Sequence, residues 1–355
     1  MNTPDAGSDA GRELPWAHAG PPLRARFKVE VEDFEVDELL GFEPTGEGEH
    51  AFLRIEKRGA NTAWIAGRLA RIAGVPPMAV GYAGLKDRHG VARQHFTVHL
   101  PGQGEPDWSL LAADGARVLL ATRHRRKLPR GALAGNRFRI VLRGIQGDAE
   151  AAQSRLAAIA AEGVPNYFGE QRFGRAGGNV AAARAMFAGR RVERAQRSIL
   201  LSAARSHLFN TLLALRVQDG SWNRASEGDV FQLDGRGSVF GPEPLDEVLR
   251  QRVAAGEIHP TGPLWGSGTL RCSAAVAARE AAVASAEPEL AAGLVAAGMA
   301  QERRALRLRV KSLAADWLAP DQLVLGFELP AGTYATVVLR ELAQLDEQHG
   351  AAGGR

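Results

Sequence analysis

Residues Val80–Leu100, VGYAGLKDRHGVARQHFTVHL, hold the pattern from which both the fold and a candidate reacting group are inferred. Residues 80–84 are mostly small, which is typical of a strand that passes close to another backbone. Residues 94–100 alternate between polar and apolar side chains and predict a second strand. A charged connection, Lys86–Gly90, joins the two. The sequence therefore predicts a strand, a charged loop and a second strand.

Asp87 in this loop is the candidate reacting group. Its neighbours Lys86 and Arg88 carry positive charges that favour the ionised carboxylate, so we expect Asp87 to be charged at neutral pH. A charged carboxylate suits a nucleophile or an electrostatic anchor and does not suit a general acid. The alternative is a structural role in the turn, because Asp followed closely by Gly is ordinary loop chemistry.

The composition describes an ordinary soluble globular protein, with 45% hydrophobic and 24% charged residues. A chain of 355 residues is long enough for two domains, or for one domain with a large insertion. A single cysteine, Cys272, excludes an intramolecular disulfide and favours a reducing compartment. No secretory signal and no apolar run of membrane-spanning length is apparent. We expect a cytoplasmic protein.

Positive charge is concentrated in one segment. The formal net charge is +4, and Arg123–Arg143 contains eight Lys or Arg and no Asp or Glu, so the remainder of the chain is net acidic. A concentrated basic segment indicates a binding surface for a polyanion. A solvated basic face is the alternative.

Four further residues have side chains whose role the sequence pattern leaves open. Lys28 is the only base in the acidic strand pattern of residues 27–37, where it could simply pair with a neighbouring carboxylate. Phe138, flanked by arginines, could stack on a nucleobase or pack in the core. Arg172 and Arg175 lie in a glycine-rich loop before a predicted helix, where an anion could bind.

Several kinds of site are not indicated. The nine histidines form no H-E-x-x-H or Cys/His cluster, so no metal is expected. Glycine fingerprints for a nucleotide cofactor are also missing, so no cofactor is expected.

Periodicity predicts further strands at 51–57, 117–122, 137–143, 303–310 and 323–329. It predicts helices at 61–74, 149–163, from Asn179, 202–213 and 274–300, with loops and short strands at 219–270.

Five motifs together resemble a known family. GYAGLKDRHGVARQ, GNRFRIVLR, VPNYFGEQRFG, LSAARSHLFN and AGTYATVVLRE occur in the order and spacing of the TruD family of tRNA pseudouridine synthases, and the resemblance covers residues 24–342. It implies isomerisation of uridine 13 of tRNA without a cofactor. In this reaction the base is detached at N1, rotated and rejoined through C5.

The resemblance also implies roles for individual residues. Asp87 matches the nucleophilic aspartate, although attack on C1′, attack on C6 and removal of a sugar proton all remain open. Tyr334 stands where the family often has Phe, so its hydroxyl has no assigned role. The other residues expected to contact the substrate are Lys28, Phe34, Asn136 and Phe138. Those expected to follow the RNA backbone are Arg125, Arg126, Lys127, Arg172 and Arg175.

The implied architecture is α+β: a catalytic domain with a mixed, largely antiparallel sheet, plus a family-specific α/β insertion domain. We expect residues 24–160 and 305–342 in the catalytic domain and residues 161–304 in the insertion. Residues 1–23 and 343–355 are expected to be a disordered N-terminus and a flexible C-terminus. The expected partner is tRNA, with no membrane, no obligate protein partner and a monomeric state. The alternative is a non-catalytic RNA-binding protein with the same fold, which the full set Lys28, Asp87, Asn136 and Phe138 disfavours.

Overall fold

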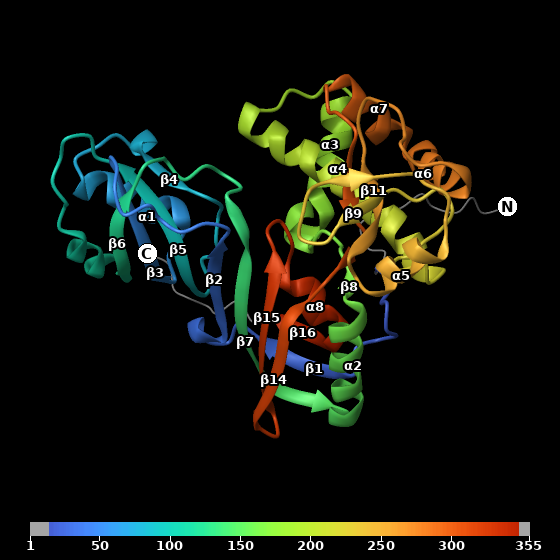
Figure 1. Ribbon diagram of the computed structural model, residues 1–355, viewed down its shortest axis with the longest axis horizontal. Helices are drawn as coiled ribbons and strands as arrows, with labels where there is room; N and C mark the ends of the chain where they lie inside the picture. The colour runs from blue at the N-terminus through green and yellow to red at the C-terminus, as the bar shows by residue number, and fades with distance from the viewer. Residues whose placement is uncertain (1–13, 348–355) are drawn as a thin grey trace. The chain divides into compact units, whose positions relative to one another are not determined.

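The computed structural model describes residues 14–347, which divide into two compact units (Figure 1). The first unit comprises Pro22–Leu156, Val310–Ala335 and the residues from Leu342 onward. The second comprises Ala157–Arg309, Thr336–Glu341 and the residues before Pro22. Residues 336–341, expected in the catalytic domain, therefore belong to the second unit. There Glu341 Oε2 accepts hydrogen bonds from the backbone N–H of Ala17 at 3.1 Å and of His18 at 3.4 Å.

A ten-stranded sheet forms the first unit, and β7 is the long strand between β15 and β2 (Figure 1). The main path runs through β14 (Lys311–Ala319), β15 (Gln322–Pro330), β7 (Leu133–Gly147), β2 (Phe34–Leu40), β5 (Val91–His99), β3 (His50–Arg58) and β6 (Ala116–His124). Off this path lie β1 (Leu23–Phe27), β16 (Ala343–Glu347) and β4 (Val80–Tyr82). Only β2–β5 and β1–β16 are parallel pairs, so the predicted mixed, largely antiparallel sheet is confirmed.

The two chain ends correct the expectations of disorder. β1 begins at Leu23, and Ala17 and His18 are held by Glu341, so the residues from 14 onward are ordered where disorder was expected. Residues 343–347 form β16, a parallel neighbour of β1, because their backbone groups complete the edge that β1 leaves open. Residues 1–13 and 348–355 lie outside the described part of the chain.

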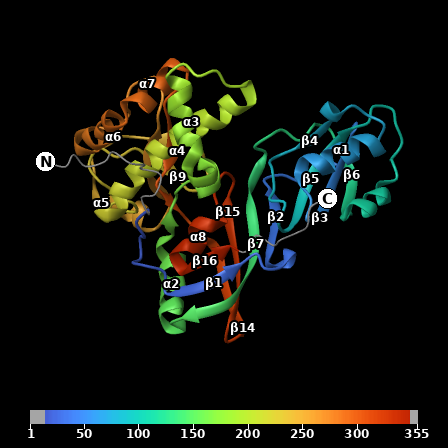
Figure 2. The same cartoon turned by 180° about the vertical axis from the view of Figure 1, so that it is seen from behind.

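Helix α1 (Thr62–Ile72) covers one face of this sheet and lies beside β4 and β5 (Figure 2). It begins where Asn61 predicts a cap, because the Asn61 side-chain oxygen accepts a hydrogen bond from Trp64 N at 2.7 Å. Ile65 and Leu69, one turn apart, are fully buried against Leu53 and Phe96. Burial of each such aliphatic side chain contributes about 1.5–3 kcal/mol. This core fixes β4 and β5 and therefore the loop between them.

The second unit is mainly helical. Its helices are α3 (Gly178–Phe187), α4 (Arg194–Gln218), α5 (Glu247–Ala254), α6 (Ala274–Ala286) and α7 (Pro288–Ala296), and α2 (Ala149–Glu162) and α8 (Ala335–Leu342) span the boundary. Its strands are β10 (Val239–Phe240), β9 (Phe231–Leu233), β11 (Ile258–Leu264) and β12 (Glu302–Ala305) in one sheet, with β8 (Val164–Pro165) and β13 (Arg307–Leu308) paired separately.

The single helix predicted at 274–300 is wrong in one respect. Pro288 lacks a backbone N–H and begins α7, so the pattern is divided into two helices at Glu287. Leu200, Leu208 and Leu212 of α4 pack in the core of this unit, whereas Leu215 on the same helix is 40% exposed. Within residues 14–347, no helix combines the length and the apolar character needed to cross a bilayer.

Candidate active site

The loop between β4 and β5 is fixed by buried polar side chains. Gln94 Nε2 donates to the backbone carbonyl of Gly84 at 2.6 Å, and Thr62 Oγ1 donates to Gln94 Oε1 at 2.9 Å. Thr62 Oγ1 in turn accepts a hydrogen bond from Lys86 N at 3.0 Å. Thr62 and Gln94 are 1% and 0% exposed, so these bonds are shielded from water. The loop that carries Asp87 is therefore held in one conformation.

Lys57, at the end of β3, also holds this loop in place. Its side chain is fully buried, and Nζ donates to the backbone carbonyls of Ala60 at 2.6 Å and Asp87 at 3.0 Å. Burial lowers the pKa of Lys57 to about 8, against the opposite effect of the Asp87 charge. Lys57 thus loses its proton near pH 8, and its amine is hydrogen-bonded to the main chain of Asp87. The protonation state of Lys57 is therefore linked to the geometry of the loop.

The Asp87 carboxylate is bound by Lys28, which follows β1. Lys28 Nζ donates a hydrogen bond to Asp87 Oδ2, and His89 N donates to Asp87 Oδ1 at 3.1 Å. Burial raises the pKa of Asp87, but the hydrogen bond and charge of Lys28 outweigh it, so the pKa lies below its usual value. The carboxylate is ionised at neutral pH, as predicted.

The cation responsible for this ionisation differs from the expected ones. Lys86 Nζ lies 2.7 Å from Glu38 Oε1, and Arg88 Nε donates to the carbonyl of Gly59 at 3.3 Å. Lys28 has a left-handed backbone, with φ of 57°, which is unfavourable for a residue with a side chain. Its partner is Asp87 and not one of the carboxylates near it in the sequence.

An aromatic cluster lies beside the ion pair. Lys28 Nζ is 4.5 Å from the centroid of the Phe34 ring, whose centroid is 6.0 Å from that of Phe138. Phe138 also contacts Phe327, with 5.5 Å between centroids. Phe34 and Phe138 are only 8% and 7% exposed, so both rings pack largely in the core. Most of the Phe138 side chain is therefore covered.

Asn136 lies two residues before Phe138 on β7. Its side-chain oxygen is buried, and within residues 14–347 it has no hydrogen-bond partner. An unpaired buried acceptor costs about 1–3 kcal/mol, which a ligand N–H would remove. Tyr334 lies in the turn between β15 and α8 and is half-buried.

Gly90 keeps the loop close to Phe34. A Cβ at Gly90 would lie 2.6 Å from Phe34 O and 2.8 Å from Phe34 Cδ1, whereas one at Gly84 would meet nothing nearer than 3.8 Å. We expect Gly90→Ala to lower the free energy of unfolding by about 1–3 kcal/mol. The control Gly84→Ala should change it by less than about 1 kcal/mol. Urea denaturation measures both, and equal effects would contradict the close packing at Gly90.

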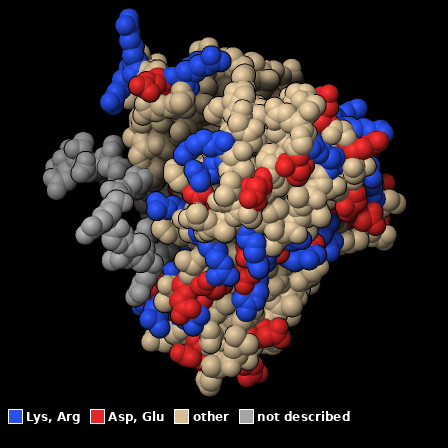
Figure 3. All heavy atoms as spheres, turned by 90° about the vertical axis from the view of Figure 1, so that its left-hand side faces the viewer, with Lys and Arg blue, Asp and Glu red and all other residues tan. Residues whose placement is uncertain are grey.

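The basic segment Arg123–Arg143 is largely neutralised by carboxylates from elsewhere in the first unit. Figure 3 shows Lys and Arg beside Asp and Glu on the face that it draws. The ion pairs are Arg123–Glu105, Arg125–Glu47, Arg137–Glu328, Arg139–Glu35 and Arg143–Asp33. Among the residues that the structure describes, Arg126, Lys127 and Arg130 have no carboxylate partner. The segment therefore presents far less free positive charge than its sequence suggests.

Arg172 and Arg175 belong to the second unit. Arg172 is partly buried, with its guanidinium 5.6 Å from the centroid of the Phe168 ring. The side chain of Arg175 lies outside the described part of the structure. No group of three or more His, Cys, Asp or Glu within residues 14–347 is arranged to hold a metal ion.

Three residues of the site were not identified from the sequence: Lys57, Thr62 and Gln94. A signal for Lys57 was present, because strand alternation places it on the same face as Leu53 and Ile55, which are fully buried. A lysine on the core face of a strand indicates a specific buried contact. Thr62 and Gln94 gave no such signal, because a Thr at the start of a helix and a Gln on a strand are both ordinary structural residues.

Comparison with known proteins gives a consistent result. The model of the family "tRNA pseudouridine synthase D (TruD)" matches residues 15–186 and 179–342. A tRNA pseudouridine synthase D of Xanthomonas campestris pv. campestris (strain B100) is 54% identical over 347 residues, which are 94% of this chain and 95% of that protein. Its counterpart in Methylococcus capsulatus is 53% identical over 338 residues, with 95% and 96% covered.

A solved structure shares the fold. A crystal structure from Methanosarcina mazei assigned to tRNA pseudouridine synthase D (TruD) matches with a TM-score of 0.70 and 23% identity. The match covers 94% of this chain and 96% of the other. At this identity the likeness concerns the α+β fold alone.

Proposed function

This chain belongs to the tRNA pseudouridine synthase D family, and we propose that it converts uridine 13 of tRNA to pseudouridine with Asp87 as the nucleophile. The observation that carries the proposal is the Asp87–Lys28 ion pair beside the Phe34 ring, which in turn lies next to Phe138. Lys28 keeps the carboxylate ionised, and 28% of the Asp87 side chain remains exposed, so a substrate can reach it.

The target uridine reaches Asp87 only after leaving its stack. Extrusion of a base costs roughly a few kcal/mol. In this proposal the exposed parts of Phe34 and Phe138 supply apolar contact to the extruded ring, and the Tyr334 ring supplies a further contact. Asn136 Oδ1, a buried acceptor without a partner among the described residues, suits the N3–H donor of uracil. Binding of uracil would thus remove the cost of an unsatisfied acceptor.

Contacts to the RNA backbone position the substrate without reading its sequence. We assign this role to Arg126 and Lys127, which have no carboxylate partner in the described structure. Arg125 is paired with Glu47 and is expected to contribute less. Arg172 and Arg175 are assigned the same role from the second unit.

The test uses tRNA transcripts labelled with tritium at uridine C5, because formation of the C5–C1′ bond releases the C5 hydrogen. We expect release of one tritium per tRNA and a pseudouridine mapped by primer extension at position 13. A transcript with cytidine at position 13 should release none. Equal release from both transcripts would refute the position. Binding of both transcripts without any release would favour a non-catalytic RNA-binding protein.

A further inference from the structure

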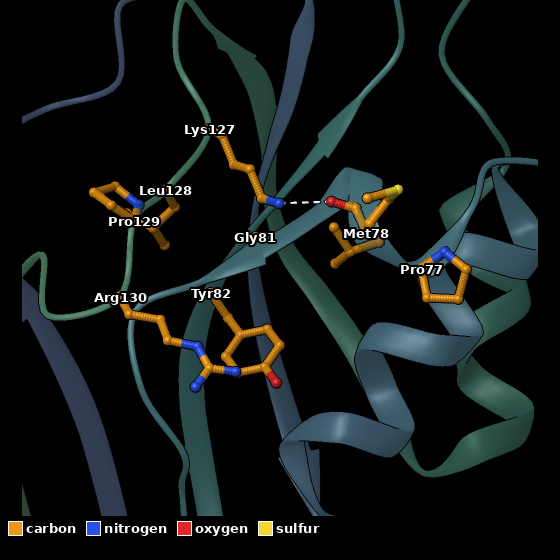
Figure 4. Close-up of a pocket in the computed structure, with 9 residues that line it drawn as sticks. Pro77, Met78, Gly81, Tyr82, Lys127, Leu128, Pro129 and Arg130 are labelled. Atoms are coloured by element: carbon orange, nitrogen blue, oxygen red, sulfur yellow. Dashed lines mark hydrogen bonds between the residues drawn. The ribbon is translucent and has the colours of Figure 1, made fainter. Parts of the chain in front are cut away.

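A hollow in the first unit lies beside the strand that leads to Asp87. It has a volume of about 470 Å³. Residues 77, 78 and 80–82, from the turn before β4 and from β4 itself, line it together with residues 127–130 of the loop between β6 and β7. Figure 4 shows Tyr82 and Arg130 on one side and the Lys127 amine directed toward Met78. The volume lies within the range of about 300–1,000 Å³ found for small-ligand pockets.

The hollow combines an aromatic ring with unpaired positive charge. The Arg130 guanidinium lies 5.9 Å from the centroid of the Tyr82 ring, and Lys127 Nζ donates to the backbone carbonyl of Met78 at 2.6 Å. No carboxylate is among its lining residues. Lys127 and Arg130 are two of the three cations of the segment Arg123–Arg143 that have no carboxylate partner in the described structure. The free charge of that segment is therefore concentrated here.

The walls of the hollow are fixed relative to each other. Gly81 lies so close to the loop that a Cβ would be 2.8 Å from Leu128 O. Leu128 N donates to Thr97 Oγ1 at 2.9 Å, and Gly131 N donates to Ala83 O at 2.8 Å. Tyr82 packs on Phe96, with 6.0 Å between ring centroids. A site with so little freedom loses little entropy when a ligand binds.

We propose that this hollow binds a second nucleotide of the tRNA, near the target uridine in the chain. The base packs against Tyr82 and Arg130, and the phosphate contacts Lys127 and Arg130. The aromatic ring supplies stacking that is open to any base, and the cations supply the salt-dependent part of the affinity. Asp87 lies five positions after Tyr82, so their Cα atoms are at most about 18 Å apart, and the nucleotide bound here lies a few positions from the target. This inference rests on the proposed function, since it takes tRNA as the ligand.

The test measures tRNA binding and tritium release for Tyr82→Leu, Tyr82→Phe and Arg130→Ala. Arg71→Ala is the matched control, because Arg71 also lies 5.9 Å from an aromatic centroid, that of Trp64, but not in the hollow. We expect Tyr82→Leu and Arg130→Ala to weaken tRNA binding about tenfold, with kcat at saturating tRNA unchanged. Tyr82→Phe retains the ring and should bind as the wild type does.

Two further measurements distinguish the contact to the base from the contact to the phosphate. Arg130→Ala should reduce the slope of log Kd against log salt by about 1, whereas Tyr82→Leu should leave the slope unchanged. A series of tRNAs lacking one base each near position 13 should include one on which Tyr82→Leu has no further effect. That tRNA identifies the bound nucleotide.

The inference is overturned if Tyr82→Leu and Arg130→Ala bind tRNA as tightly as the wild type, or if Arg71→Ala loses as much affinity as they do. Failure of the proposed function has a different signature, because the wild-type protein would then release no tritium. Thermal unfolding of each variant excludes misfolding as the cause of lost binding. Arg130 is exposed, so its replacement leaves the core intact.

Discussion

Asp87→Asn is expected to reduce tritium release from uridine-labelled tRNA by about 10⁴-fold or more, the scale on which loss of a reacting group acts. Asparagine has the shape of aspartate, but it carries no charge and cannot act as a carboxylate nucleophile. The affinity for tRNA should change by less than about threefold, because exposed cations supply most of the binding energy. Single-turnover release and a filter-binding assay measure the two effects.

Asp37→Asn is the matched control for this substitution. Asp37 lies on β2 in the same unit and is also ion-paired, with Arg54 at 3.2 Å and Arg93 at 3.3 Å, but it has no contact with Lys28. We expect its activity to stay near that of the wild type. If Asp87→Asn retained more than about a tenth of wild-type release, Asp87 would not be the nucleophile.

Lys57→Met is expected to lower kcat by about 10- to 100-fold with little change in the KM for tRNA. The substitution removes the hydrogen bond from Lys57 Nζ to the main chain of Asp87, and bonds from charged donors contribute about 1.5–3 kcal/mol. Methionine fills a similar volume, so the core should remain packed. Lys57 acts through Asp87 and does not touch the substrate, so its role is positioning.

The pH dependence distinguishes this role from a general loss of stability. The pKa of Lys57 is about 8 in the folded protein and 10.5 when unperturbed. Between these values the unfolded chain holds a proton that the folded protein has released, so this group makes the protein more stable as pH rises. Wild-type kcat should nevertheless fall from pH 7 to pH 9, toward the level of Lys57→Met, as the ammonium loses its charge.

Lys57→Met itself should show no fall centred near pH 8, because it carries no group that titrates there. Thermal unfolding across the same pH range shows whether stability follows activity. Identical pH profiles of kcat for the two proteins would contradict the positioning role of Lys57. A fall in wild-type activity that coincided with unfolding would contradict it as well.

The parts of the fold set by local chemistry were predictable. Strands β4 and β5 and the Asn61 cap of α1 follow from alternation and capping, which depend on residues close in sequence. The parts of the fold that depend on residues distant in the sequence were not predictable. In residues 27–37 the apolar alternation changes phase and predicts a bulge or turn at Glu32–Asp33, where the structure has a short 3₁₀ helix, Val31–Asp33, but nothing in the pattern predicts the left-handed backbone of Lys28.

The ion-pair partner of each charged side chain was the least predictable property, because it depends on residues that are close in space but distant in the sequence. Arg137 is flanked by cations and uncharged residues in the sequence, but its partner Glu328 lies 2.7 Å away on the neighbouring strand. Arg143 is similarly paired with Asp33 at 2.9 Å. Lys28 is a further case, because its partner Asp87 lies 59 residues away and the carboxylates near Lys28 in the sequence do not indicate it.

The pairing of β1 with β16 has a consequence for how the protein is made. Leu23 pairs with Ala343, so the strand that leads to Lys28 gains this neighbour only after some 320 further residues have been translated, about 15–60 s later. Until β15 has been translated, the edge of β7 that will pair with it, from Gly135 to Arg143, has no strand beside it. A nascent sheet with an open edge is prone to pair with other chains.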